Sequence, residues 1–266
     1  MLKDITIGQY IPGESVVHRT DPRTKIVLTV LFMAVVFLID SYHAFLILSL
    51  FTLVMILSSG IPVKYTLKGL KPVLIIIAFT VVINVFTVSG TPVSDYGILR
   101  YITYEGIHLS IKMALRLSML IMGASLLTFT TTPISLTDGL EKLMKPFSSI
   151  GLPVHEIAMM MAIALRFIPT ILEETEKIIK AQTSRGAEFD TGNILERAKS
   201  FIPVLVPLFI SAFRRADDLA TAMEARCYRG STGRTRMKQL KFTGADIMSS
   251  AVMLVFSAAL LFIEYM

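Results

Sequence analysis

The stretch Pro72–Val88, with the sequence PVLIIIAFTVVINVFTV, carries no charge and approaches the roughly 20 residues that a membrane-spanning helix needs. The runs Ile26–Ile39 and Ala44–Leu57 are also uncharged, and only Asp40-Ser41-Tyr42-His43 separates them. A continuous helix over both would be roughly 48 Å long, too long for a bilayer core of about 30 Å, so we expect a hairpin of two short spans. Two more spans are expected at Ile107–Phe129 and Ile247–Ile263. The sequence therefore predicts an all-α integral membrane protein with about five transmembrane helices.

Composition supports the membrane class. Of the 266 residues, 53% are apolar and 17% are charged, and the mean hydropathy is +0.66. A soluble domain usually has about 25% charged residues. Cys227 is the only cysteine, which excludes an intramolecular disulfide and a cysteine-based zinc site. Residues 1–21 contain no apolar core before a small-residue cleavage site, so no cleaved signal peptide is expected.

The basic residues predict the orientation in the membrane. If the N-terminus is cytoplasmic, the inner segments contain 23 of the 26 lysines and arginines, and only Arg100 falls in an outer loop. This is a strong positive-inside bias and predicts a multi-pass protein of the cell membrane. The net charge of +6 then follows from topology, and nucleic acid is not an expected partner.

The long basic stretch after the fourth span differs from a soluble domain. Leu136–Phe147 has the pattern of a short amphipathic helix, while Ile157–Leu165 and Phe201–Phe213 are apolar but too short for a span. If the last two crossed the bilayer, several lysines and arginines would lie outside, so we expect long helices in or under the inner membrane face. The predicted regions are an N-terminal membrane region at 1–132, a cytoplasmic region at 133–244 and a C-terminal span at 245–266.

Two short arginine signatures lie in this cytoplasmic region. Ser184-Arg185-Gly186 ends a predicted helix from about His155 to Arg185, and Ala225-Arg226-Cys227 lies near the end of a later helix that Gly230 is expected to stop. A cation suits the C-terminal end of a helix dipole, so each arginine could be an ordinary helix-end residue. Their recurrence between small neighbours favours a docking function, because a guanidinium in a partner's groove can bind a carboxylate through two hydrogen bonds.

Four other charged residues are candidates. Lys112 and Arg116 lie one turn apart in the fourth span, where a charge is either functional or reaches toward the lipid headgroups. The headgroup interpretation is slightly favoured. Asp21 and Arg23 either cap and anchor the first span or pack against the cytoplasmic helices.

These residues resemble the transmembrane component of energy-coupling factor transporters, a branch of ATP-binding cassette importers for vitamins and metal ions. That family carries two Ala-Arg-Gly signatures at the ends of two long cytoplasmic coupling helices, which Ser184-Arg185-Gly186 and Ala225-Arg226-Cys227 match. Asp21-Pro22-Arg23-Thr24-Lys25 also looks like the family's N-terminal sequence. Ser184 replaces an alanine, and Cys227 replaces a glycine and adds a side chain where close approach can matter.

The resemblance implies a division of labour. Arg185 and Arg226 would dock into grooves of two related ATPase subunits, whose ATP-driven closure would move the coupling helices. A separate small membrane protein would bind the vitamin or other micronutrient and reorient against apolar faces of these helices. The chain has no GxxxxGKS/T phosphate loop, so the partners would use the ATP. This chain would bind no cofactor or metal, and it would not be an enzyme.

The three consecutive methionines Met159, Met160 and Met161 have an adaptable apolar surface that suits exchangeable partners, although a place in the core is the more common role of such residues. Two other functions are alternatives. Asp217-Asp218 faintly resembles the motif of CDP-alcohol phosphotransferases, but the required glycine is absent and no aspartate follows Arg226 until Asp246. A conventional permease would need its own substrate site, for which the spans offer few polar groups. The sequence does not identify the transported substrate.

Overall fold

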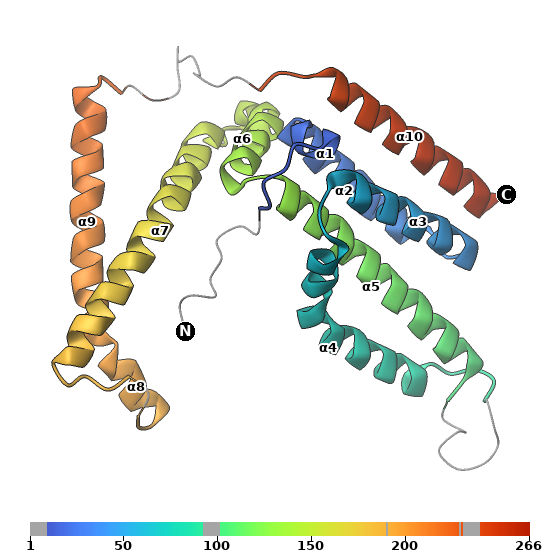
Figure 1. Ribbon diagram of the computed structural model, residues 1–266, viewed down its shortest axis with the longest axis horizontal. Coiled ribbons are helices and arrows are strands. Elements are labelled where there is room, and N and C mark those ends of the chain that lie inside the picture. The colour runs from blue at the N-terminus through green and yellow to red at the C-terminus, as the bar shows by residue number, and fades with distance from the viewer. Residues whose placement is uncertain (1–9, 93–101, 190, 229, 231–239) are drawn as a thin grey trace. The chain divides into compact units, whose positions relative to one another are not determined.

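The computed structural model describes residues 10–92, 102–189, 191–228, 230 and 240–266, so Arg100 lies outside the described residues (Figure 1). Within these ranges the regular elements are all helices, which confirms the all-α fold class. The α-helices are α1 (Val16–Arg19), α2 (Pro22–Leu38), α3 (Tyr42–Ser59), α4 (Val63–Thr87), α5 (Tyr104–Thr130), α6 (Pro133–Met144), α7 (Val154–Ser184), α8 (Ile194–Ser200), α9 (Ile202–Ala225) and α10 (Gly244–Tyr265), and a 3₁₀ helix, η3, covers Lys145–Ile150.

The contacts divide the chain into two units. We call the described residues of 8–143 and 239–266 the bundle unit, and those of 144–238 the α7–α9 unit. Nearly all of α6 belongs to the bundle unit, because Gly139 brings its backbone against Pro22 and Ile26 of α2. The predicted regions 1–132, 133–244 and 245–266 were defined by where the chain is expected to cross the membrane, not by contacts within the chain. They stay a prediction.

The bundle unit begins with the expected hairpin. Asp21 caps the start of α2 by accepting a hydrogen bond from the Arg23 amide, and Pro22 occupies the first turn, where its missing N–H costs nothing. Ser41 caps α3 in the same way. A buried apolar core then joins α2, α3, α5 and α10; it consists of Phe32, Val35, Val36, Ile39, Ala44, Phe45, Leu48, Met119, Met253 and Leu260.

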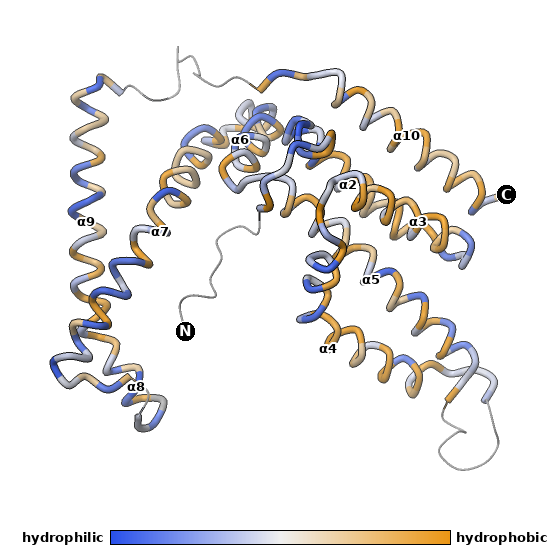
Figure 2. Tube along the Cα trace, viewed as in Figure 1, coloured by the Kyte–Doolittle hydropathy of each residue, from blue (hydrophilic) through white to orange (hydrophobic). Residues whose placement is uncertain are grey.

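Helix α4 packs against α5 (Figure 1) and is apolar along most of its length (Figure 2). Most of its apolar side chains are exposed. The two backbones approach closely because Gly106 has no side chain: a Cβ there would lie 3.0 Å from the Asn84 carbonyl oxygen. The Ser110 hydroxyl donates to the Val81 carbonyl across the same contact, at 3.2 Å. None of the most apolar window of α4 is buried, so the described chain leaves most of the hydrocarbon surface of this helix uncovered.

Five helices are long and apolar enough to cross a membrane: α3, α4, α5, α7 and α10. The number agrees with the sequence prediction, but the set differs. Helix α2 has 17 residues, at the lower limit for a span, whereas α7 has 31 because it continues through Pro169. Ile157–Leu165 is thus the apolar part of a long helix, which agrees with the helix predicted from about His155 to Arg185. The position of α7 at the inner membrane face stays a prediction.

Candidate docking site at the ends of α7 and α9

The first arginine signature closes α7 with a well-defined backbone motif. Arg185 is the last residue near helical geometry, and Gly186 has φ +89°. The Gly186 amide donates to the Thr183 carbonyl and the Ala187 amide donates to the Gln182 carbonyl, each at 3.0 Å. These two bonds define a Schellman motif, which satisfies carbonyl groups that a helix end otherwise leaves without partners.

The second signature closes α9 with the same motif. Arg226 takes the place of Arg185, and Cys227 has φ +56°. The Cys227 amide donates to the Glu224 carbonyl at 2.8 Å, and the Tyr228 amide donates to the Met223 carbonyl at 3.0 Å. Helix α9 therefore ends at Ala225 rather than at Gly230, because the left-handed residue turns the chain out of the helix there.

Cys227 keeps this geometry at a conformational cost. Among the described residues it is the only non-glycine residue with positive φ. An L-residue with a side chain in this region is destabilised by about 1 kcal/mol relative to the right-handed conformation. The departure from glycine thus changes the energy of the second helix end and leaves its hydrogen-bond pattern intact.

Both arginines are available for an outside partner. Arg185 and Arg226 are exposed, and within the described part of the chain neither guanidinium has a hydrogen bond or an ion pair. Their neighbours Ser184 and Ala225 are small and exposed, and the Ser184 hydroxyl is turned back onto the Lys180 carbonyl at 3.0 Å. Each helix end can therefore approach another surface closely while presenting five guanidinium donors.

The two signatures lie at opposite ends of a helix pair. The Tyr228 hydroxyl, just after α9, donates to the Met159 sulfur in the first part of α7 at 3.1 Å. At the other end, the rings of Phe189, after α7, and Phe201, before α9, have centroids 5.2 Å apart. Helices α7 and α9 are thus antiparallel (Figure 1). With 24 residues in α9, its two ends are about 36 Å apart.

An ion pair also joins the two helices. Arg215 of α9 and Glu174 of α7 are 2.6 Å apart, and their side chains are 34% and 25% exposed. The sequence did not indicate this pair or the Tyr228–Met159 contact, because both depend on the pairing of two helices that are distant in the chain.

Each of the two helices is apolar mainly in its first half and hydrophilic toward its arginine end (Figure 2). Met160 and Met161 are exposed, whereas Met159 is partly covered and holds Tyr228. In α9 the exposed apolar residues are Ile202, Leu205, Val206, Phe209, Ile210 and Phe213, which we call the α9 apolar face. So much exposed hydrocarbon on one helix is typical of a surface that contacts lipid or another protein.

Comparison with known proteins identifies the family. A family model described as cobalt transport protein CbiQ matches residues 13–238. The energy-coupling factor transporter transmembrane protein EcfT of Ruminiclostridium cellulolyticum is 63% identical over 265 residues, covering 100% of this chain and 99% of that protein. The chain belongs to the energy-coupling factor transporter transmembrane proteins.

Other members of this family are similarly close. The EcfT protein of Clostridium kluyveri is 52% identical over 256 residues, which is 96% of this chain and 95% of the relative. That of Bacillus subtilis is 47% identical over 264 residues, or 98% of each chain. The family resemblance seen in the sequence is confirmed, and the chain is a membrane component of a transporter.

In this EcfT-type chain Asp21 and Arg23 form part of a polar junction. The Asp21 carboxylate accepts from the Arg23 side chain through two bonds, of 3.0 and 2.9 Å, while the Asp21 amide donates to Asp246 at 2.6 Å. The Arg23 guanidinium also lies 4.1 Å from the centre of the Phe242 ring. The pair therefore caps α2, as expected, and also fixes the start of α10. Its packing against coupling helices stays a prediction.

Arg116 contacts the turn between α2 and α3, and its reach toward the lipid headgroups stays a prediction. Its guanidinium donates to the Ile39 carbonyl at 2.7 Å and pairs with Asp40 at 2.9 Å, and its side chain is only 15% exposed. The turn after α2 thus supplies carbonyl and carboxylate oxygens to this cation. Lys112 lies over the Tyr42 ring, 5.6 Å from its centre. Both cations of α5 thus hold the α2–α3 turn.

Proposed function

We propose that this chain is the coupling subunit of an energy-coupling factor importer for a vitamin or similar micronutrient. Arg185 and Arg226 dock two ATP-binding cassette ATPases, and α7 and α9 pass the ATP-driven movement to a separate substrate-binding membrane protein. The observation that carries the proposal is the repetition of one helix-end structure, with an exposed and unpaired arginine, at both signatures.

The chemistry of each helix end suits a carboxylate-bearing groove. The Schellman bonds leave the last turn with few unsatisfied carbonyls, so inserting it into a partner buries little unpaired polar backbone. The exposed guanidinium can then form two parallel hydrogen bonds with one carboxylate of the groove. A lysine offers a single charged point and cannot reproduce that geometry.

The separation of the signatures favours two docking partners rather than one. The ends of α9 are about 36 Å apart, and the antiparallel arrangement places Arg185 and Arg226 at opposite ends of the pair. A single small groove cannot contact both arginines. Two related ATPases, each with one groove, fit this arrangement and supply the ATP chemistry, so that this chain itself binds no cofactor.

The contacts between α7 and α9 couple the movements of the two helices. The Arg215–Glu174 ion pair and the Tyr228–Met159 hydrogen bond tie the helices at two levels, so displacement of one helix end moves the other helix. The α9 apolar face, with Met160 and Met161 on α7, offers the substrate-binding protein an adaptable hydrophobic surface. The positive-inside bias supports a cytoplasmic location for the two arginines.

Replacing both arginines tests the docking. The R185A/R226A double variant should remain in the membrane, lose co-purification of the two ATPases in mild detergent and lose substrate uptake. The matched control is R166A/R214A, which removes two exposed arginines from the same helices away from the signatures. Normal uptake and normal ATPase recovery by the double variant would refute the proposal, as would an equal loss in the control.

Labelling tests the orientation. A cysteine placed at Thr191, between α7 and α8, in a chain carrying C227S should react with an impermeant maleimide only in inside-out vesicles. Reaction from the outside of intact cells would place the α7–α9 unit on the wrong side for ATPases.

A further inference from the structure

The bundle unit contains a cavity that takes no part in the proposed docking. It has a volume of about 290 Å³ and lies among α1, α2, α3, α5 and α10. An engineered apolar cavity of about 150 Å³ already takes up benzene. An empty space of the larger size would deprive its lining side chains of contacts that a close-packed interior normally supplies. The cavity is therefore large enough to hold a substantial part of a hydrocarbon chain.

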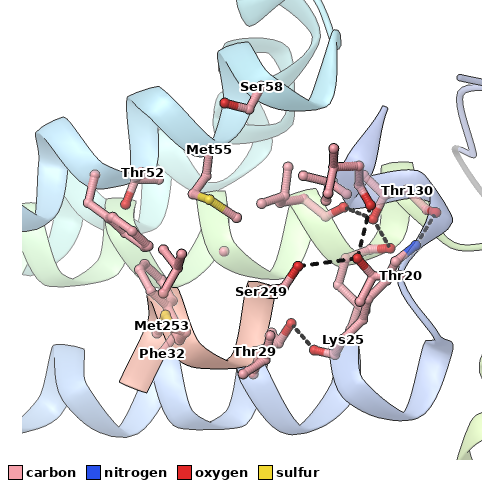
Figure 3. A pocket seen from close by; sticks show the side chains of 18 of the residues that line it. Thr20, Lys25, Thr29, Phe32, Thr52, Met55, Ser58, Thr130, Ser249 and Met253 are labelled. Carbon is pink, nitrogen blue, oxygen red and sulfur yellow. Dashed lines mark hydrogen bonds between the residues drawn. The ribbon is translucent and has the colours of Figure 1, made fainter. Parts of the chain in front are cut away.

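The cavity has a polar end and an apolar end (Figure 3). Thr20, Lys25 and Thr130 gather at one end, and Phe32 and Met253 line the other. The polar end lies where α2 and α10 begin and α5 finishes, whereas the apolar end reaches into the core of the bundle. This segregation matches an amphiphilic molecule with its tail directed along the helices.

The hydroxyl groups along the walls do not require a polar ligand. Thr29 and Thr52 donate to the backbone carbonyls of Lys25 and Leu48, each at 2.8 Å. Thr130 does the same with the Leu126 carbonyl at 2.8 Å. With these donors satisfied inside their own helices, the walls resemble hydrocarbon. A polar solute would lose its hydration there without finding partners.

Lys25 gives the polar end its charge. The residue is only 8% exposed, and its ammonium donates to the His18 and Thr130 carbonyls at 3.1 and 2.8 Å. Two of its three hydrogens are thereby used. Among the described residues no carboxylate forms an ion pair with Lys25. The Asp21 and Asp246 carboxylates act on its charge only from beyond ion-pair distance. The third hydrogen of the ammonium can therefore still be donated to an anionic oxygen at this end of the cavity.

We propose that this cavity binds an anionic phospholipid, with one acyl chain between Phe32 and Met253 and the phosphate near Lys25. A membrane lipid fits better than a soluble amphiphile because the lining residues Val16, Met248 and Val252 are apolar and about half exposed, so the opening of the cavity is hydrophobic. A chain can therefore enter from the bilayer without crossing water.

Native mass spectrometry tests the proposal on the full chain. The protein is reconstituted in vesicles of equal amounts of phosphatidylcholine and phosphatidylglycerol, then extracted in mild detergent. Wild type should retain one phosphatidylglycerol. S249F, which fills the cavity from α10, should lower the retained fraction about tenfold. The matched control S250F changes the next residue, which does not line the cavity, and should behave as wild type.

Two further measurements separate the headgroup from the tail and do not depend on folding of S249F. K25M should remove the preference for phosphatidylglycerol over phosphatidylcholine, while K25R should keep it. In wild type, phosphatidylglycerol with a photoreactive acyl chain should crosslink to peptides containing Phe32 or Met253. Absence of a retained lipid, equal retention of both phospholipids, retention of a free fatty acid or crosslinks only outside the cavity would each overturn the proposal.

Discussion

The ends of α7 and α9 have the same hydrogen bonds but different residues at the left-handed position. Gly186 adopts φ +89° without a side chain in the way, while Cys227 adopts φ +56° with one. The comparison shows that the backbone motif sets the position of the arginine. A glycine at the left-handed position lowers the free-energy cost of the motif, but the motif also forms without it. The two ends are thus equivalent in geometry and unequal in stability.

The largest expected effect comes from removing one arginine at a time. R185A and R226A should each release one ATPase and lower uptake by about tenfold or more, because the loss of a charge-assisted pair costs about 1.5–3 kcal/mol. R185K and R226K should retain little of the docking or the uptake, because lysine lacks the planar guanidinium group. Quantitative co-purification of each ATPase measures the effect. If one variant released both ATPases equally, the assignment of one partner to each end would fail.

An intermediate effect is expected from the ion pair between the helices. R215M should reduce uptake while both ATPases still co-purify, because the docking ends persist but their connection is weakened. Since the pair is partly exposed, its contribution to stability is expected to be at most about 1 kcal/mol. The reverse-charge double variant R215E/E174R should recover uptake. Failure of that rescue, with both ATPases bound, would argue against a mechanical role.

A smaller effect is expected from giving α7 the residue that α9 carries. G186C should destabilise the α7 end by about 1 kcal/mol, because its φ of +89° disfavours any side chain. No other atom lies within 4 Å of the added Cβ, so steric overlap does not contribute. Hydrogen–deuterium exchange of the last turn of α7 should become faster in G186C. G186A, which also adds a side chain at this position, should give a similar increase. Unchanged exchange in both would contradict the strain argument.

The smallest effect is expected from C227G. Glycine relieves the strained φ but gains entropy in the unfolded chain, so the net gain should be only about 0.5 kcal/mol. Exchange of the Cys227 and Tyr228 amides should slow slightly, and uptake should remain near the wild-type rate. A large loss of uptake would show that the thiol itself contacts the partner.

Local chemistry made much of this structure predictable. The hairpin at Asp40-Ser41-Tyr42-His43 and the cap at Asp21 follow from neighbouring residues, and the structure has both. The position of Arg116 was not predictable, since its oxygen partners come from a turn some 76 residues away. Five helices have the length and composition of a span, as predicted, and α7 is among them in place of the shorter α2. Which of these helices cross the membrane stays a prediction.

The candidate docking site was also predictable only in part. The arginines at two helix ends follow from the sequence alone, as do the small flanking residues. That Cys227 would keep the motif could not be foreseen, because its φ is decided by the competition between two backbone hydrogen bonds and a side-chain clash. The antiparallel pairing, which separates the two arginines, rests on contacts such as Tyr228–Met159 that no local pattern encodes.

The exposed position of α4 has a consequence for the response of the protein to its membrane. Lipid tails are as apolar as the helix, so hydrophobicity alone does not favour the contact with α5 over contact with lipid. That contact rests instead on the close backbone approach at Gly106 and the bond from Ser110. A thinner or thicker bilayer acts on such a helix by changing its tilt. A change in bilayer thickness should therefore act on α4 together with α5, its main partner in the bundle unit.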